Sequence, residues 1–203
     1  MSSFKKPRLK RGVPPKKKIK RHKYREALPE LIRDFGARCA YSMQHEIRCG
    51  ALEVDHFDPR KKKNLIQDYN NLFPASRHCN GKKSDTWPNK AEQAAGCRFI
   101  NPCEELDYGE QIFEDIVTHK LVGVTPAAKW HIRICGLNAD RLIEERRRRA
   151  RHWKTIRNRA IRVKKNIPHE AALELISGFS EEVRLMIPEI LPPPDSTIHR
   201  TRH

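Results

Sequence analysis

The 203-residue sequence has few aromatic residues, 7% of the total, and no long apolar run. Its purely apolar stretches are only a few residues long, as at 121–124, whereas a membrane span needs about 20. The basic N-terminus does not lead into an apolar stretch with a cleavage site, so no secretory signal is predicted. We therefore expect a cytoplasmic protein without a membrane partner, or a nuclear one in a eukaryote, because 16–21 fits a nuclear address.

Cysteine is also scarce, since six residues are too few to form a disulfide framework in a chain of this length. In a reducing compartment, cysteines are more often buried small side chains or metal ligands. For Cys97, Cys103 and Cys135 we expect packing in the core.

Acidic residues are absent from residues 1–25, which hold 12 basic ones, and residues 141–165 hold 12 basic and 2 acidic. The remainder of the chain is net −5, although the whole is +17. Such a distribution favours a polyanionic partner that meets two basic segments. The competing interpretation is a solubilising tail and a solvated helix face.

Hydrophobic spacing and turn residues predict several elements. A helix is expected over 24–35, closed by Gly36, and a long amphipathic helix from Asn138, as its N-cap, to about residue 165. The other predicted elements are strands at 52–57 and 70–73, a helix beginning near Cys79, a hairpin of 111–117 with 120–124, a helix opened by Thr125-Pro126, and short helices at 168–177 and 180–187.

Four separated polar elements follow one another between residues 54 and 83. Asp55-His56 comes first, Asn71 follows, and then come Asn80 and Lys83, giving the order D-H…N-N-L…C-N-x-x-K. This order resembles the HNH endonuclease family over residues 39–85, about a quarter of the chain. The resemblance implies a ββα-metal module, in which two antiparallel strands and a helix surround one divalent cation, and products with 5′-phosphate and 3′-hydroxyl ends.

Phosphodiester hydrolysis requires a base for water, a Lewis acid and neutralisation of the phosphate charge. His56 would be the general base, since an imidazole is partly unprotonated near neutral pH. Asp55 would hold the metal. Neighbouring residues of a strand point to opposite faces, so the two can act together only where the strand ends or twists.

By the resemblance, Asn80 would be the second metal ligand and Asn71 would bond the loop backbone and orient His56. Oxygen ligands of this kind suit Mg²⁺ or Mn²⁺. His78 is the alternative second ligand, or else a surface side chain. Basic residues expected to contact nucleic acid are Arg77, Lys82, Lys83, Arg146, Arg147 and Arg149.

Many members of the family carry two C-x-x-C pairs that hold a structural zinc. Here the corresponding pairs are Cys39 with Ser42 and Ser76 with Cys79, which makes a poor tetrahedral site. We expect no zinc and expect Cys39 and Cys79 to be packed neighbours. The alternative is a zinc site completed by Cys49, His45 or His78.

The segments 98–103, 107–109 and 136–138 are similar to HNH proteins of Septu-type and retron anti-phage systems, which act beside an ATPase subunit. We therefore expect an α+β protein with a disordered basic arm (1–24), a nuclease module (25–90), a hairpin and helical lobe (91–190) and a tail (191–203). Its predicted function is metal-dependent DNA cleavage in defence. The alternative is a catalytically silent HNH scaffold that binds nucleic acid or assembles with a partner.

Overall fold

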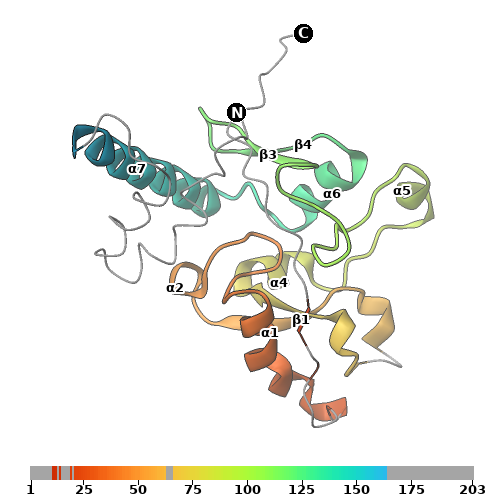
Figure 1. Ribbon diagram of the computed structural model, residues 1–203. Helices are drawn as coiled ribbons and strands as arrows, with labels where there is room; N and C mark the ends of the chain where they lie inside the picture. The colour runs from red at the N-terminus through yellow and green to blue at the C-terminus, as the bar shows by residue number, and fades with distance from the viewer. Residues whose placement is uncertain (1–10, 13, 15–18, 20, 63–65, 164–203) are drawn as a thin grey trace.

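The computed structural model describes residues 11–12, 14, 19, 21–62 and 66–163 (Figure 1). Its elements in chain order, with η for 3-10 helices, are η1 Arg21–Ala27, α1 Leu28–Asp34, α2 Glu46–Cys49, β1 Leu52–His56, η2 Pro59–Lys61, η3 Tyr69–Asn71, β2 Leu72–Ser76, α4 Arg77–Lys83, α5 Lys90–Ala94, β3 Ile112–Glu114, β4 Leu121–Gly123, α6 Pro126–Ile134 and α7 Asp140–Val163. The fold is α+β, as predicted. No helix among these described residues is long and apolar enough to cross a membrane.

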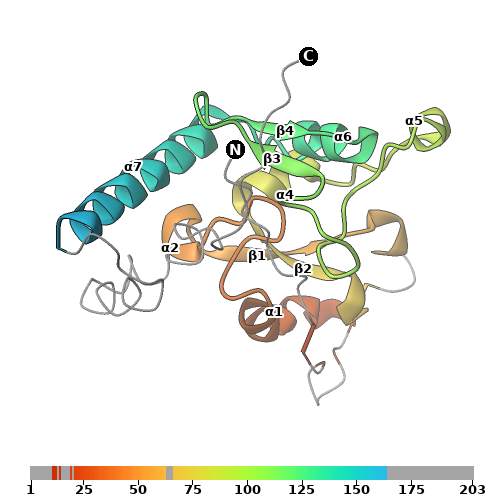
Figure 2. The same ribbon diagram turned by 45° about the horizontal axis from the view of Figure 1, so that its top comes forward.

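The strands β1 and β2 pair antiparallel, with Leu52 opposite Ser76 and His56 opposite Leu72. Helices α1 and α4 cover the two faces of this pair (Figures 1 and 2). On the α1 face, Val54 packs with Leu31 and Leu72 in one apolar cluster. Because side chains alternate along a strand, Glu53 and Asp55 lie on the other face, against α4.

The second strand begins two residues later than predicted, because the residues before it form the 3-10 turn η3. The Asp68 side chain accepts a hydrogen bond from the Asn70 backbone N–H and caps this turn. The strand then runs directly into α4, whose N-cap is Ser76, with its hydroxyl accepting from the Cys79 N–H. The helix predicted to begin near Cys79 therefore begins at Arg77.

A second layer, formed by the β3–β4 hairpin and α6, packs above α4 (Figure 2). Thr125 caps α6 through a hydrogen bond from the Ala128 N–H, and Pro126 occupies the first turn, as predicted. The largest apolar cluster joins this layer to the β1–β2 module, with Ala75, Cys79, Phe99 and Trp130 among its members. Cys135 lies in this core, while Cys97 and Cys103 are half-buried at the edges of the apolar clusters.

The long basic helix α7 extends away from the rest of the described chain (Figure 2). The prediction that Asn138 is its N-cap is wrong. The Asn138 side chain instead bonds both backbone groups of Leu121 in β4, at 2.7 and 2.9 Å. It therefore ties the start of α7 to the hairpin rather than capping the helix.

Two short helices, α2 and α5, are not predicted from the sequence, and α5 carries a clear local signal. Its signal is a capping box, in which Asn89 accepts from the Glu92 N–H and the Glu92 carboxylate accepts from the Asn89 N–H. The predicted helices at 168–177 and 180–187, the tail at 191–203 and most of the arm lie outside the described residues.

Candidate active site

On the α4 face of the strand pair, Asp55 is 4% exposed and lies in a buried polar cluster. The Tyr41 hydroxyl donates to one carboxylate oxygen, and the Lys83 ammonium lies 2.9 Å from the same oxygen. Lys83 also donates to the carbonyl oxygen of His56, at 2.7 Å. Burial raises the pKa of Asp55, and the Lys83 charge acts against that rise.

Lys83 is fully buried, which contradicts the prediction that it contacts a phosphate. One turn of helix separates it from Asn80, so both face β1, and Asp55 supplies the charge that an interior ammonium requires. The exposed cations of α4 are Arg77, at its start, and Lys82, next to Lys83. Their contact with nucleic acid stays a prediction.

Asn80 also faces β1, where its amide nitrogen donates to a Glu53 carboxylate oxygen at 2.7 Å. Glu53 was not singled out from the sequence, although strand alternation places it two residues from Asp55 on the same face. His78 turns the other way, and its Nε2 lies 3.0 Å from the carbonyl oxygen of Gly136. Of the two alternative ligands on α4, Asn80 is thus the one beside the carboxylates.

His56 ends β1 and is 3% exposed. Its Nε2 lies 2.8 Å from the carbonyl oxygen of Ile66, an acceptor, so Nε2 carries the proton and Nδ1 the basic lone pair. The Tyr24 ring packs on the imidazole with 4.7 Å between centroids. Burial lowers the pKa of His56, which favours the neutral, proton-accepting ring.

Asn71 fastens the loop that follows His56. Its side-chain oxygen accepts from the Asp58 N–H at 2.8 Å, and its amide donates to the Asp58 carbonyl oxygen at 3.0 Å. Its own carbonyl oxygen accepts from the Phe57 N–H at 2.8 Å. The loop-backbone contact implied by the family resemblance is therefore present, and its role in catalysis stays a prediction.

Cys39 and Cys79 are fully buried, lie in one apolar cluster and interact with each other, and the expectation that they hold no zinc stays a prediction. The Ser42 N–H points at the Cys39 sulfur at 3.4 Å, and Ser76 also bonds to it through its backbone. Burial acts to raise the pKa of Cys39, but these hydrogen bonds outweigh it and lower the pKa to about 5. The two C-x-x-C positions thus form a cysteine and serine cluster held by hydrogen bonds.

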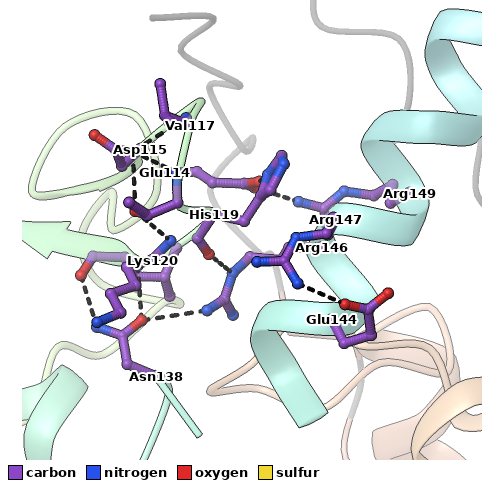
Figure 3. Close-up of polar contacts among 12 residues, drawn as sticks. Glu114, Asp115, Val117, His119, Lys120, Asn138, Glu144, Arg146, Arg147 and Arg149 are labelled. Atoms are coloured by element: carbon purple, nitrogen blue, oxygen red, sulfur yellow. Dashed lines mark hydrogen bonds and ion pairs between the residues drawn. The ribbon is translucent and has the colours of Figure 1, made fainter. Parts of the chain in front are cut away.

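Three arginines of α7 were predicted to bind nucleic acid, and Figure 3 shows them engaged with the hairpin or with their own helix. Arg146 is 6% exposed and donates to the carbonyl oxygens of His119 and Leu137, at 2.6 and 3.0 Å, which contradicts its predicted role. Arg149 pairs with Glu114 of β3 at 2.5 Å. Arg147 is exposed and pairs with Glu144 at 2.7 Å. For these two, nucleic-acid contact stays a prediction.

The α4 face offers oxygen donors of the kind that Mg²⁺ and Mn²⁺ prefer, from Glu53, Asp55 and Asn80. In the part of the chain that the structure describes, no three His, Cys, Asp or Glu side chains gather as a metal cluster. Mg²⁺ needs no such cluster, because it is commonly held by one or two carboxylates, with water and substrate phosphate completing the octahedron. The donor set therefore fits a hard cation. Asp55 could bind such a cation once its ion pair with Lys83 opens.

The family model for HNH endonuclease matches residues 37–86, which include β1, β2 and α4. No curated protein and no solved structure matches the chain significantly. The matched segment covers about a quarter of the chain and contains every hydrogen-bond partner described above for Asp55, His56, Asn71 and Asn80, whereas Tyr24, whose ring packs on His56, lies outside it. Residues 37–86 are thus similar to an HNH endonuclease domain, which supports a nuclease in general, and domains of this family generally depend on a divalent metal.

Proposed function

We propose that residues 37–86 hydrolyse DNA phosphodiester bonds with Mg²⁺ or Mn²⁺, with His56 as general base and Asp55 and Asn80 as metal ligands. The observation that carries this proposal is the match of the HNH endonuclease model to the segment in which Asp55 and Asn80 share the α4 face. His56 and Asn71 lie at the same end of the strand pair, because His56 follows Asp55 and pairs with Leu72.

In this proposal, His56 accepts the proton of the attacking water at Nδ1, since Nε2 is engaged by the Ile66 carbonyl oxygen. Asn71 holds the loop at Asp58 and keeps the imidazole at the strand end. The cation, when bound, supplies a Lewis acid for the departing oxygen. Lys83 contributes a buried positive charge beside the site in place of a phosphate contact.

The metal assignment is tested with chelator-treated protein, supercoiled plasmid and added Mg²⁺, Mn²⁺ or Zn²⁺. We expect nicked or linear products with Mg²⁺ or Mn²⁺, and a loss of about 10²-fold in cleavage rate for Asn80→Ala. Asn70→Ala is the matched control, because this asparagine is exposed. Equal cleavage by wild type and Asn80→Ala would remove Asn80 from the metal site. Binding of DNA without cleavage under any metal would favour the silent scaffold.

We propose further that the nuclease acts beside an ATPase in a cytoplasmic anti-phage system, on the similarity of segments 98–103, 107–109 and 136–138 alone. The β3–β4 hairpin, which lies between the second and third of these segments in the chain, is flanked by exposed apolar side chains, among them Val117 at 78% and Val124 at 57%. Co-expression with a candidate ATPase subunit, followed by purification, tests this partner. We expect wild type to co-purify and Val117→Asp to do so less, whereas separate elution of wild type would contradict the assembly.

A further inference from the structure

Arg11 belongs to the basic arm that was predicted to be disordered, yet its guanidinium binds the backbone of the nuclease module. One terminal nitrogen donates to the carbonyl oxygen of Tyr69 at 2.9 Å. The other donates to the carbonyl oxygens of Asn70 and Leu72, at 3.0 and 2.9 Å. A single side chain thus binds three carbonyl groups within four consecutive residues, a geometry that the planar fork of arginine supports.

Aromatic rings surround the same guanidinium. Its central carbon lies 4.4 Å from the ring centroid of Phe73, 5.4 Å from that of Tyr69 and 5.7 Å from that of Phe35. These distances lie within the range of cation–π attraction. The arrangement gives Arg11 both hydrogen-bond acceptors and a ring surface, so that lysine could not replace it fully.

The neighbouring residue is also fitted to the module. The Gly12 N–H donates to the Asp34 carboxylate at 2.9 Å, and the Tyr69 hydroxyl donates to the same oxygen at 2.7 Å. A Cβ at Gly12 would lie 2.5 Å from the other Asp34 oxygen, closer than real Cβ atoms come. At Arg11 and Gly12 the arm therefore packs closely against α1 and η3.

The three carbonyl groups that Arg11 binds flank Asn71 on both sides. Asn71 in turn holds Phe57 and Asp58, the two residues that follow His56. We propose that Arg11 is a positioning residue of the nuclease site, which fixes the backbone around Asn71 and through it the loop behind His56. This inference rests on the proposed nuclease function and places a residue outside the matched segment in the machinery of the site.

A different role would be direct attraction of DNA, because Arg11 belongs to the basic arm. The two roles separate kinetically, since a DNA contact changes affinity whereas a positioning residue changes the rate once DNA is bound. Single-turnover cleavage at saturating DNA, together with the Kd for DNA, therefore decides between them. The variants are Arg11→Ala and Arg11→Lys, with Arg8→Ala as a control that removes one charge from the same arm.

We expect Arg11→Ala to lower the single-turnover rate about 10²-fold, the loss that a small misplacement causes, while its Kd matches that of Arg8→Ala. Arg11→Lys keeps the charge but loses the fork, so it should recover only part of the rate. Millimolar guanidinium should restore rate to Arg11→Ala and leave Arg8→Ala unchanged. A higher Kd with an unchanged saturating rate would overturn the positioning role.

A second readout does not depend on cleavage. Amide hydrogen exchange at Phe57 and Asp58, whose N–H groups bond to Asn71, should speed up in Arg11→Ala and not in Arg8→Ala. Unchanged exchange at Leu121, in the distant hairpin, would show that the variant is folded. Unchanged exchange at Phe57 and Asp58 would overturn the inference. If the wild-type protein cuts no DNA but Arg11→Ala still exchanges faster at Phe57 and Asp58, the nuclease function is refuted while the link from Arg11 to this loop is supported.

Discussion

The two antiparallel strand pairs use buried charge in different ways. Beside β1–β2, Asp55 and Lys83 pair with each other, so a carboxylate and an ammonium balance inside the module. Beside β3–β4, Arg146 reaches from α7 and is held by carbonyl oxygens of His119 and Leu137 (Figure 3). The first arrangement maintains charged groups next to the candidate site, and the second fastens a helix to a hairpin.

This difference changes how much basic surface the net charge of +17 implies. Lys83 and Arg146 are counted among the 42 basic residues, but both are buried and add little to the surface that DNA would meet. Lys82 and Arg147 are exposed, so they are the kind of cation that we expect to meet phosphate in the proposed DNA complex. The net charge of a sequence therefore overstates the basic surface wherever cations serve as internal tethers.

The largest effect is expected from Lys83→Met, which leaves Asp55 buried without its cation. Removing one partner of a buried ion pair costs about 3–5 kcal/mol of unfolding free energy, whereas replacing both partners is nearly neutral. Urea denaturation should therefore show a strong loss for Lys83→Met and partial recovery in Asp55→Leu/Lys83→Met. The exposed Lys82→Met is the control. Wild-type stability in Lys83→Met, with weakened DNA binding, would restore the phosphate role instead.

Arg146→Ala should have a smaller effect, about 1–3 kcal/mol of unfolding free energy, because it leaves buried carbonyl groups without a donor. Urea denaturation measures this loss, and a fluorescence binding assay should give an unchanged Kd for DNA. If DNA affinity fell while stability held, Arg146 would have to give up its bonds to the His119 and Leu137 carbonyl oxygens to bind phosphate.

Arg147→Ala provides the comparison on the same helix. This residue is exposed, so we expect a stability change within about 0.5 kcal/mol. DNA affinity should fall for all sequences alike, and the slope of log K against log salt should drop by about 1. An unchanged slope would show that Arg147 stays paired with Glu144 in its own helix and does not contact a phosphate.

The smallest effect is spectroscopic and contrasts two buried thiols. Hydrogen bonds lower the pKa of Cys39 to about 5, whereas burial raises the pKa of Cys135 well above its ordinary value. The ultraviolet thiolate band at neutral pH should vanish in Cys39→Ser and persist in Cys135→Ser. Stability from the Cys39 thiolate is complete above its ordinary pKa of 9 and is lost as the pH falls through about 5. A band that persists in Cys39→Ser would contradict this assignment.

Local signals in the sequence predicted much of this fold. The register of Asp55, Asn71 and Asn80 identified the module, and Thr125-Pro126 and Gly36 marked helix boundaries. Long-range contacts were not predictable, because no local pattern shows that Lys83 would meet Asp55 or that Asn138 would bond β4. The sequence places Arg11 in a disordered arm for the same reason, since its acceptors lie 58 to 61 residues away.

The candidate site shows a similar division. The amino-acid types and their order indicated the chemistry of His56 and Asn80, but the residues that hold them came only from the structure. Tyr24 and Ile66, which contact His56, lie on an N-terminal helix and in the loop after β1, and neither matches a motif. Glu53 was within reach of the sequence, because alternation along β1 places it beside Asp55.

The proposed role of His56 as the general base of DNA hydrolysis is tested most directly by single-turnover cleavage of supercoiled plasmid with Mg²⁺. His78→Ala is the control, because His78 is a half-buried histidine that faces Gly136. We expect a loss of about 10²- to 10⁴-fold in rate for His56→Ala, with His78→Ala cutting like wild type. Equal cutting by wild type and His56→Ala would contradict it.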